Sequence, residues 1–202
     1  MRFFPFLLAA LSCVSTPLRS FAQSPPVVPS SPAFAERISL PGVPNAAKIS
    51  AHLFRGAQPD FSSLPQLKTL GVTTIVDLRL EFSKIREKER HVAESLGLSF
   101  VSIPVGGFSN PSSEQLAQFF WLVRETPPQK IFVHCEYGED RTGVFIASYR
   151  IAFQHWSAKQ ALSEMYAFGF HNPWHSGMAT FVRQLPARLQ SDPTLKAALP
   201  VP

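Results

Sequence analysis

The sequence predicts an α/β domain built on a central, mostly parallel sheet of about four to five strands flanked by helices. Short runs rich in Val, Ile and Phe alternate with longer helical patterns, which is typical of parallel strands that are buried on both faces. The 202 residues, of which 45% are hydrophobic, correspond to one domain with one core. The last part of the chain carries helical patterns only, so the C-terminal end of the domain is expected to be helical.

Four short apolar runs are the predicted strands. The last three are dominated by Val, Ile and Phe and lie between helical patterns, as expected for parallel strands joined by crossover helices. The four runs are residues 51–55, 72–77, 98–103 and 130–134.

Six segments have the periodicity of helices. Gly71 and Gly97 follow the first two and predict where these helices end. Ser112 and Gln115 have the spacing of a capping box at the start of the third. The fourth is apolar nearly all round, which predicts a central, buried helix, whereas the charged run 84–90 in the second predicts a solvated helix face. The segments are residues 61–70, 83–96, 112–126, 142–153, 157–168 and 179–189.

The N-terminal segment has the layout of a secretory signal peptide. Arg2 precedes a short apolar run, and small residues lead up to a cleavage site after Ala22. We therefore expect an exported bacterial protein, periplasmic or secreted, with lipid anchoring through Cys13 as the less favoured alternative. The expected divisions of the chain are the signal peptide at 1–22, a Pro/Ser-rich linker at 23–35, the domain at 36–190 and a C-terminal tail at 191–202.

Charge and cysteine content exclude several classes of protein. Nineteen Lys and Arg against fourteen Asp and Glu give a net charge of +5, without the blocks of like charge that favour nucleic-acid binding. No apolar stretch of about eighteen residues follows the N-terminal segment, so no integral membrane segment is expected after cleavage, and a monomer is expected. Cleavage would leave Cys135 as the lone cysteine, with no internal disulfide partner. We therefore expect its thiol to have a chemical role.

Residues 130–143 predict a strand, a tight loop and the start of a helix. Backbone N–H groups of such a loop, with the helix dipole behind them, form an anion site. Cys135 begins the loop and Arg141, whose planar fork matches two phosphate oxygens, closes it. The same positive field is expected to lower the thiol pKa from about 8.5 toward the range of about 3.5–7.5, which makes the thiolate a nucleophile. The residues expected to line the substrate site are Glu136, Tyr137, Gly138, Glu139, Asp140 and Arg141.

The pattern His134-Cys135, five residues, then Arg141-Thr142-Gly143 resembles the signature of cysteine-dependent protein tyrosine and dual-specificity phosphatases. The likeness covers roughly residues 50–170 and is closest to the small bacterial dual-specificity-like group. It implies a phosphatase-type phosphate loop in which Cys135 attacks phosphorus and forms a cysteinyl-phosphate. It also implies that Arg141 and the loop N–H groups hold the phosphoryl oxygens. His134 would order the loop, Thr142 would donate to the sulfur as it leaves, and neither a metal nor a cofactor would be needed.

The sequence departs from the family in the loop that usually supplies a general-acid Asp. Residues 104–111 contain no carboxylate. Asp140 is the first candidate for this acid, followed by Glu114 and Asp60. An equally weighted interpretation makes Asp140 a structural partner of a nearby arginine, such as Arg55 or Arg79.

Two further groups have open interpretations. Arg79 ends a predicted strand, where it could bind phosphate or support the loop, or form a surface ion pair with Glu81. His171 and His175 have the spacing of a helical metal pair, but Pro173 lies between them and no third ligand is near, so no zinc site is expected.

The predicted function is a metal-independent phosphomonoester hydrolase that acts on a phosphorylated protein or a small phosphomonoester. Acidic residues in the loop, Glu136, Glu139 and Asp140, favour phosphotyrosine-type substrates over inositol polyphosphates, which require several cations. The alternatives are a phosphate-binding pseudophosphatase that has lost its acid, a phosphoinositide or inositol phosphate phosphatase, and, least favoured, a sulfur-transfer domain.

Overall fold

The computed structural model describes residue 1 and residues 33–80, 83–124, 129–170 and 176–200. Pro32–Pro202 form one compact unit, which is the domain. Within the described ranges, no helix has the length and apolar character needed to cross a bilayer. The predicted signal peptide, Cys13, nearly all of the predicted linker, Glu81 and the pair His171 and His175 lie outside those ranges.

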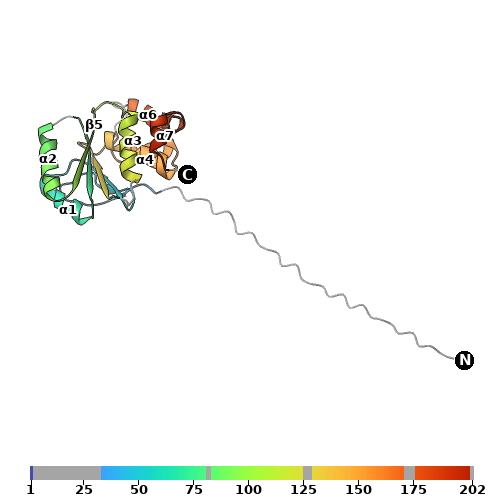
Figure 1. Cartoon of the computed structure of the whole chain (residues 1–202), viewed down its shortest axis with the longest axis horizontal. Helices are drawn as coiled ribbons and strands as arrows, with labels where there is room; N and C mark the ends of the chain where they lie inside the picture. Colours follow the sequence, from blue (N-terminus) through green and yellow to red (C-terminus); the bar gives the residue numbers. More distant parts are fainter. Residues whose placement is uncertain (2–32, 81–82, 125–128, 171–175, 201–202) are drawn as a thin grey trace. The chain divides into compact units, whose positions relative to one another are not determined.

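A six-stranded mixed sheet forms the centre of the domain, in the order β1-β2-β3-β6-β4-β5 (Figure 1). Its core is parallel, because β3 pairs with β6, β6 with β4 and β4 with β5 in parallel, while β1 and β2 are added antiparallel at one edge. This arrangement confirms the predicted α/β class and all four predicted strands. The strands are β1 (Glu36–Arg37), β2 (Ala47–Lys48), β3 (Leu53–Gly56), β4 (Thr74–Arg79), β5 (Ser99–Val105) and β6 (Ile131–His134).

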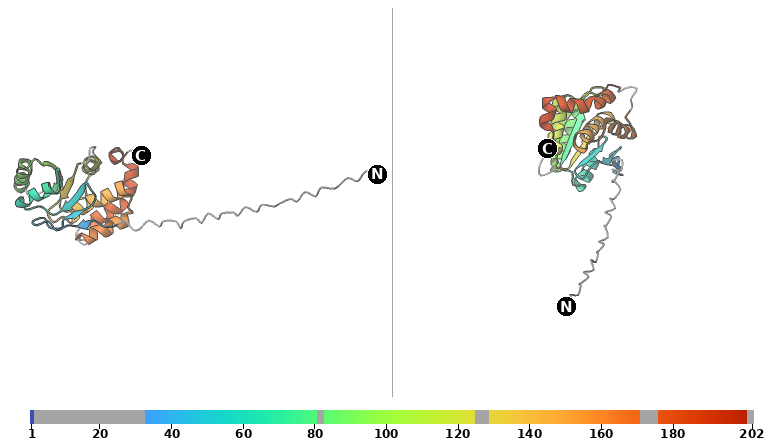
Figure 2. Two further views of the ribbon diagram at one scale, coloured as in Figure 1. Left: turned by 90° about the horizontal axis from the view of Figure 1, so that it is seen from below. Right: turned by 90° about the vertical axis from the view of Figure 1, so that its right-hand side faces the viewer.

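Alternate residues of the central strands supply two separate apolar layers. Ile75 and Phe132 face one layer, against the two helices that lie on that side of the sheet, whereas Val76 and Val133 face the larger layer beneath the remaining helices. Every residue of β3, β4 and β6 is buried. Figures 1 and 2 show the sheet between α1 and α2 on one side and the other helices opposite.

All six predicted helices are present, with one more at the C-terminus. The first is a 3-10 turn, η1 (Phe61–Ser63), that continues as α1, and the fourth begins at Asp140, two residues earlier than predicted. The α-helices are α1 (Leu64–Thr69), α2 (Ser83–Ser95), α3 (Ser113–Arg124), α4 (Asp140–Gln154), α5 (Ala158–Ala167), α6 (Ser176–Ser191) and α7 (Pro193–Ala198).

The segment 191–202, expected as a tail, contains a packed helix instead. Asp192 caps α7 by accepting hydrogen bonds from the backbone N–H groups of Thr194 and Leu195. Leu195 and Ala198 are fully buried in the larger apolar layer, and α7 packs on α3. Burial of these two side chains, rather than the helix propensity of a six-residue segment, explains why the chain end folds back onto the domain.

Candidate active site

The loop between β6 and α4 places the predicted nucleophile and the predicted arginine at one end of the parallel sheet. Cys135 follows β6 directly and is 3% exposed, as a free thiol. Arg141, 7% exposed, lies in the first turn of the buried helix α4, and its Nη1 donates to the carbonyl of Val105, the last residue of β5, at 3.2 Å. The carboxyl ends of β6 and β5 therefore hold both side chains, as expected for a site at the C-terminal edge of a parallel sheet.

Neighbouring elements hold three carbonyl groups of the loop from outside. The pairs are Cys135 O with His134 Nδ1 (3.1 Å), Glu136 O with the Gln58 N–H (3.1 Å) and Gly138 O with Asn45 Nδ2 (3.0 Å). In a trans peptide the C=O and the following N–H point in opposite directions. The N–H groups that follow these carbonyls therefore point away from the three donors. They belong to Glu136, Tyr137 and Glu139, and with the N-terminus of α4 they are the groups available to bind an anion.

Gly138 lets the loop pack directly on the end of β3. Its φ is +68°, and a Cβ at this position would lie 2.4 Å from the carbonyl carbon of Gly56 and 2.6 Å from the nitrogen of Ala57. Both contacts are shorter than any side chain tolerates and involve backbone atoms. Glycine is therefore required here for its conformation and for the close approach.

A fully buried network of ionisable groups lies behind the loop. Glu89 of α2 approaches His134, with Oε1 2.9 Å from Nε2, and its other oxygen accepts from Nη2 of Arg79 at 2.5 Å. Arg79 in turn binds Asp77 through Nε at 2.8 Å. The contact between Glu89 and His134 is an ion pair without the geometry of a hydrogen bond. Two carboxylates, one arginine and a protonated His134 carry no net charge, so the network is balanced when His134 is charged.

The pKa directions agree with this balance. Burial works against the imidazolium of His134, but the negative charges of Glu89 and Asp77 outweigh it, so the pKa of His134 is raised. For Asp77, burial is likewise outweighed by hydrogen bonds from Arg79 and by nearby positive charge, and its pKa is lowered. A charged His134 has a proton on Nδ1 to donate to the carbonyl of Cys135.

Arg79 lies inside this network, one contact removed from His134, and not on the surface. Its side chain is fully buried and binds Asp77 and Glu89, and Glu89 in turn contacts the histidine that precedes the nucleophile. The charged run 84–90 is therefore not only a solvated face, because Glu89 points inward and is 0% exposed.

The three candidates for the general acid lie in different surroundings. Glu114 is exposed in the first turn of α3, and hydrogen bonds from its own backbone N–H and from Ser112 lower its pKa, which is opposite to what a general acid requires. Asp60 lies at the start of η1, where its N–H donates to the carbonyl of Gly42. Asp140 is half-buried, opens α4 and precedes Arg141, so it is the candidate nearest to Arg141 in the chain.

The other acidic side chains of the loop have structural contacts of their own. The carboxylate of Glu139 lies against Gly169, where a Cβ would be 2.8 Å from its Oε1. Glu136 interacts with the hydroxyl of Tyr137 and raises the pKa of that phenol, and the Tyr137 ring is 64% exposed. Within the described residues, no group of three or more His, Cys, Asp or Glu side chains is arranged to hold a metal ion.

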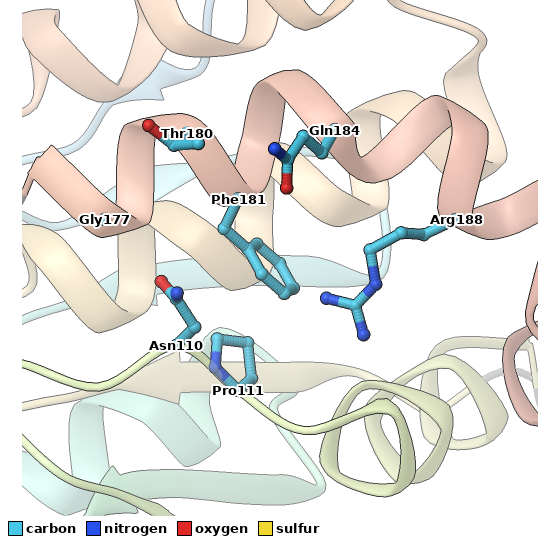
Figure 3. Close-up of a pocket in the computed structure, with 7 residues that line it drawn as sticks. All are labelled: Asn110, Pro111, Gly177, Thr180, Phe181, Gln184 and Arg188. Atoms are coloured by element: carbon cyan, nitrogen blue, oxygen red, sulfur yellow. The ribbon is translucent and has the colours of Figure 1, made fainter.

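The loop that follows β5 leads from the site to a groove against α6. It starts beside Val105, which contacts Arg141, and ends at Asn110 and Pro111. Figure 3 shows these two residues opposite Phe181 and Arg188 of α6. No residue of the segment 135–141 lines this groove, so it is a hollow separate from the loop of Cys135.

Comparison with known proteins identifies the family. Residues 41–182 match the family described as "DSP-PTPase phosphatase fused to NAD+ Kinase". The chain belongs to this dual-specificity phosphatase family. TpbA of Pseudomonas aeruginosa strain UCBPP-PA14, a dual specificity protein phosphatase, is 32% identical over 142 residues, which are 70% of this chain and 62% of TpbA. The match therefore spans a little less than two thirds of the length of that relative.

Solved structures of dual-specificity phosphatases and related proteins share the fold. A TpbA crystal structure in complex with pTyr has a TM-score of 0.65 at 24% identity and covers 83% of this chain and 97% of that one. The core catalytic domain of the PP-IP phosphatase SIW14 from S. cerevisiae has a TM-score of 0.63 at 20% identity, with 81% and 99% covered.

Several residues that support this dual-specificity phosphatase site were not predicted. Asn45 and Gln58 hold loop carbonyls, and Glu89 holds His134. Asn45 has a φ of +55°, an unusual conformation for a residue other than glycine, but the sequence signals it only as a turn former. Glu89 is one of several acidic residues in a charged helix, and no pattern in that helix distinguishes it.

Proposed function

We propose that this dual-specificity phosphatase domain hydrolyses phosphomonoesters through a cysteinyl-phosphate intermediate and without a metal ion. The observation that carries the proposal is that two buried residues, Cys135 and Arg141, stand at the two ends of the loop between β6 and α4, at the carboxyl edge of the parallel sheet. Positive charge and oriented N–H donors around a thiol favour the thiolate and bind the phosphoryl group.

In the first step, the thiolate of Cys135 attacks phosphorus. A bond forms between Sγ and phosphorus, the ester P–O bond breaks, and the leaving oxygen takes the electron pair. Arg141 and the loop N–H groups hold the three equatorial oxygens, where charge accumulates in the transition state. The backbone carbonyl of Val105 fixes the direction of the guanidinium.

In the second step, water attacks phosphorus, the bond to Sγ breaks, and the thiolate leaves as inorganic phosphate forms. Thr142 is fully buried, and its hydroxyl has no hydrogen-bond partner among the described residues. A buried, unsatisfied hydroxyl carries an energetic penalty, which is relieved if it donates to the sulfur that leaves. We therefore assign this donation to Thr142.

Asp140 is proposed to give the leaving oxygen its proton. A general acid contributes about 10²–10⁴-fold, and most when the leaving group is a poor one. Asp140→Asn is expected to lower kcat on phosphotyrosine about 10²-fold, but kcat on p-nitrophenyl phosphate less than about threefold. Steady-state kinetics on both substrates measures this difference.

Glu114→Gln and Asp60→Asn are the matched controls for this prediction, because each removes a carboxylate that was also a candidate. Neither control variant is expected to lower kcat on phosphotyrosine more than kcat on p-nitrophenyl phosphate. Equal kinetics of Asp140→Asn and the unmodified chain on both substrates would exclude Asp140 as the acid.

The substrate class that we propose is phosphotyrosine in proteins or small aryl phosphates. The net negative charge of the loop, from Glu136, Glu139 and Asp140, opposes densely phosphorylated ligands. The pTyr complex of TpbA supports the same class, whereas SIW14 is named a PP-IP phosphatase. The test is turnover by the full chain, with EDTA present, of an aryl phosphate, a phosphotyrosine peptide and an inositol polyphosphate. Turnover of the inositol compound alone would overturn the proposed substrate, and turnover of none would overturn the proposed reaction.

We also propose that the protein is exported. The support is the sequence of residues 1–22, with a charge at Arg2, a short apolar run and small residues before Ala22. Mass spectrometry of the expressed protein is expected to find an N-terminus at Gln23 in the exported fraction. Retention of Met1 in the cytoplasm would contradict export.

A further inference from the structure

Arg55 lies behind the phosphate loop, in the strand next to the one that leads to the nucleophile. It belongs to β3, which pairs with β6, and its side chain is 0% exposed. Its Nη2 donates to the carbonyl of Gly138, the same carbonyl that Asn45 holds. The guanidinium carbon lies 4.3 Å from the centre of the Phe168 ring. Arg55 thus contacts the loop at the carbonyl of Gly138.

The positive charge of Arg55 has no anion in contact with it. Nε and Nη1 are buried without a hydrogen-bond partner, and no ion pair within the described residues includes Arg55. The carboxylate whose charge most favours it is Glu164, but both oxygens of Glu164 accept from Arg150, at 2.6 and 3.0 Å. One of them also accepts from the N–H of Ala35.

Burial without a counter-charge is unfavourable for the guanidinium. It lowers the pKa of Arg55 to about 10, and the like charges of Arg37 and Arg150 act in the same direction. A buried cation of this kind is unfavourable for the fold unless an anion compensates it. Arg55 pairs with Val133 across the sheet, two residues before Cys135, so its charge lies beside the strand that leads to the nucleophile. A nearby positive charge favours the ionised form of a thiol.

We propose that Arg55 is a positioning residue that orients the loop through the carbonyl of Gly138 and supplies a buried positive charge that favours the thiolate of Cys135. This inference rests on the proposed phosphatase function and adds a residue from outside the loop to it. The charge of His134 at the start of the loop is balanced by Glu89, whereas no carboxylate among the described residues contacts Arg55.

Two variants separate the charge of Arg55 from its hydrogen bond. Arg55→Gln keeps an N–H donor for the carbonyl of Gly138 and removes the charge. Asn45→Ala removes a neutral donor to the same carbonyl and keeps the charge of Arg55. Both are made in the full chain together with Cys13→Ser, so that Cys135 is the sole thiol. The readouts are the pH profile of Cys135 alkylation by iodoacetamide and kcat/KM for an aryl phosphate.

The midpoint of the alkylation profile is expected to rise by about one pH unit in Arg55→Gln, which is about a tenfold loss of thiolate at low pH. The same variant is expected to lose about tenfold or more in kcat/KM at pH 6. In Asn45→Ala, kcat/KM is expected to fall while the midpoint stays unchanged. If Arg55→Gln does not fold, Arg55→Met, which buries no unpaired polar group, is measured in the same way.

An unchanged midpoint in a folded Arg55 variant would overturn the inference, and so would an equal rise in Asn45→Ala, because that change leaves the charge in place. These results are distinct from failure of the proposed function. That failure would appear as absence of turnover in the unmodified chain, whereas the alkylation profile requires no turnover.

Discussion

Cys135→Ser is expected to lower turnover of an aryl phosphate by at least about 10⁴-fold, because the nucleophile of the proposed reaction is a thiolate. A serine hydroxyl is not ionised near neutral pH and is a much weaker nucleophile than a thiolate. Cys135 is 3% exposed and serine is slightly smaller, so the loop is expected to keep its shape. Its N–H groups and Arg141 would still bind an anion. The variant should therefore bind phosphotyrosine without hydrolysing it.

Phosphate release with EDTA present measures the loss, and calorimetry with phosphotyrosine measures the binding. Cys13→Ser is the matched control, since it makes the same chemical change at the other cysteine of the chain and is expected to retain activity. Turnover that persists in Cys135→Ser would exclude the thiolate mechanism. Binding without turnover in both Cys135→Ser and the unmodified chain would instead support a phosphate-binding pseudophosphatase.

The parallel core of the fold could be predicted because its strands are buried on both faces. Runs such as Ile75-Val76 have no polar alternation, and each is followed by a helical pattern. The strands β1 and β2 have two residues each, and their pairing with β3 rather than their own sequence makes them strands. Asp192 and Pro193 have the pattern of a helix start. The helix α7 forms, however, because Leu195 packs in the larger apolar layer, where α7 contacts α3.

The catalytic part of the site could be predicted because it is contiguous. Cys135 and Arg141 are separated by five residues, and the strand-loop-helix context is visible in the sequence. The supporting residues could not be predicted in the same way. Asn45 lies in the turn before β2, Arg55 in β3 and Glu89 in α2, and only the tertiary structure brings them to the loop.

The buried network behind the loop leads to the second prediction, which concerns stability. Glu89→Gln is expected to lower the free energy of unfolding by about 3–5 kcal/mol at pH 6, because His134 and Arg79 lose one of the two carboxylates that balance their charges. For a domain of this size, that corresponds to a decrease in Tm of at least about 6 °C. The reason is the lost anion, since Gln has nearly the same volume as Glu. Urea unfolding at pH 6 measures the effect.

Glu94→Gln is the matched control, because Glu94 lies on the same helix, α2, and is exposed. It is expected to change the free energy of unfolding by less than about 0.5 kcal/mol. If Glu89→Gln had the same free energy of unfolding as the unmodified chain at pH 6, the result would contradict a charged network.

The pH dependence tests the protonation state of His134 directly. Its folded pKa is raised, so the stabilisation is fully present below the unfolded value of about 6.5 and is lost as the pH rises through the folded pKa. For Asp77 the pKa is lowered, so its contribution is present above about 3.8 and is lost as the pH falls. In Glu89→Gln the anion that most raises the pKa of His134 is gone, and burial then favours the neutral imidazole. The difference in unfolding free energy between the two proteins should therefore be largest near pH 6 and should narrow toward pH 9. A difference that is constant across this range would show that Glu89 acts through packing and not through the charge of His134.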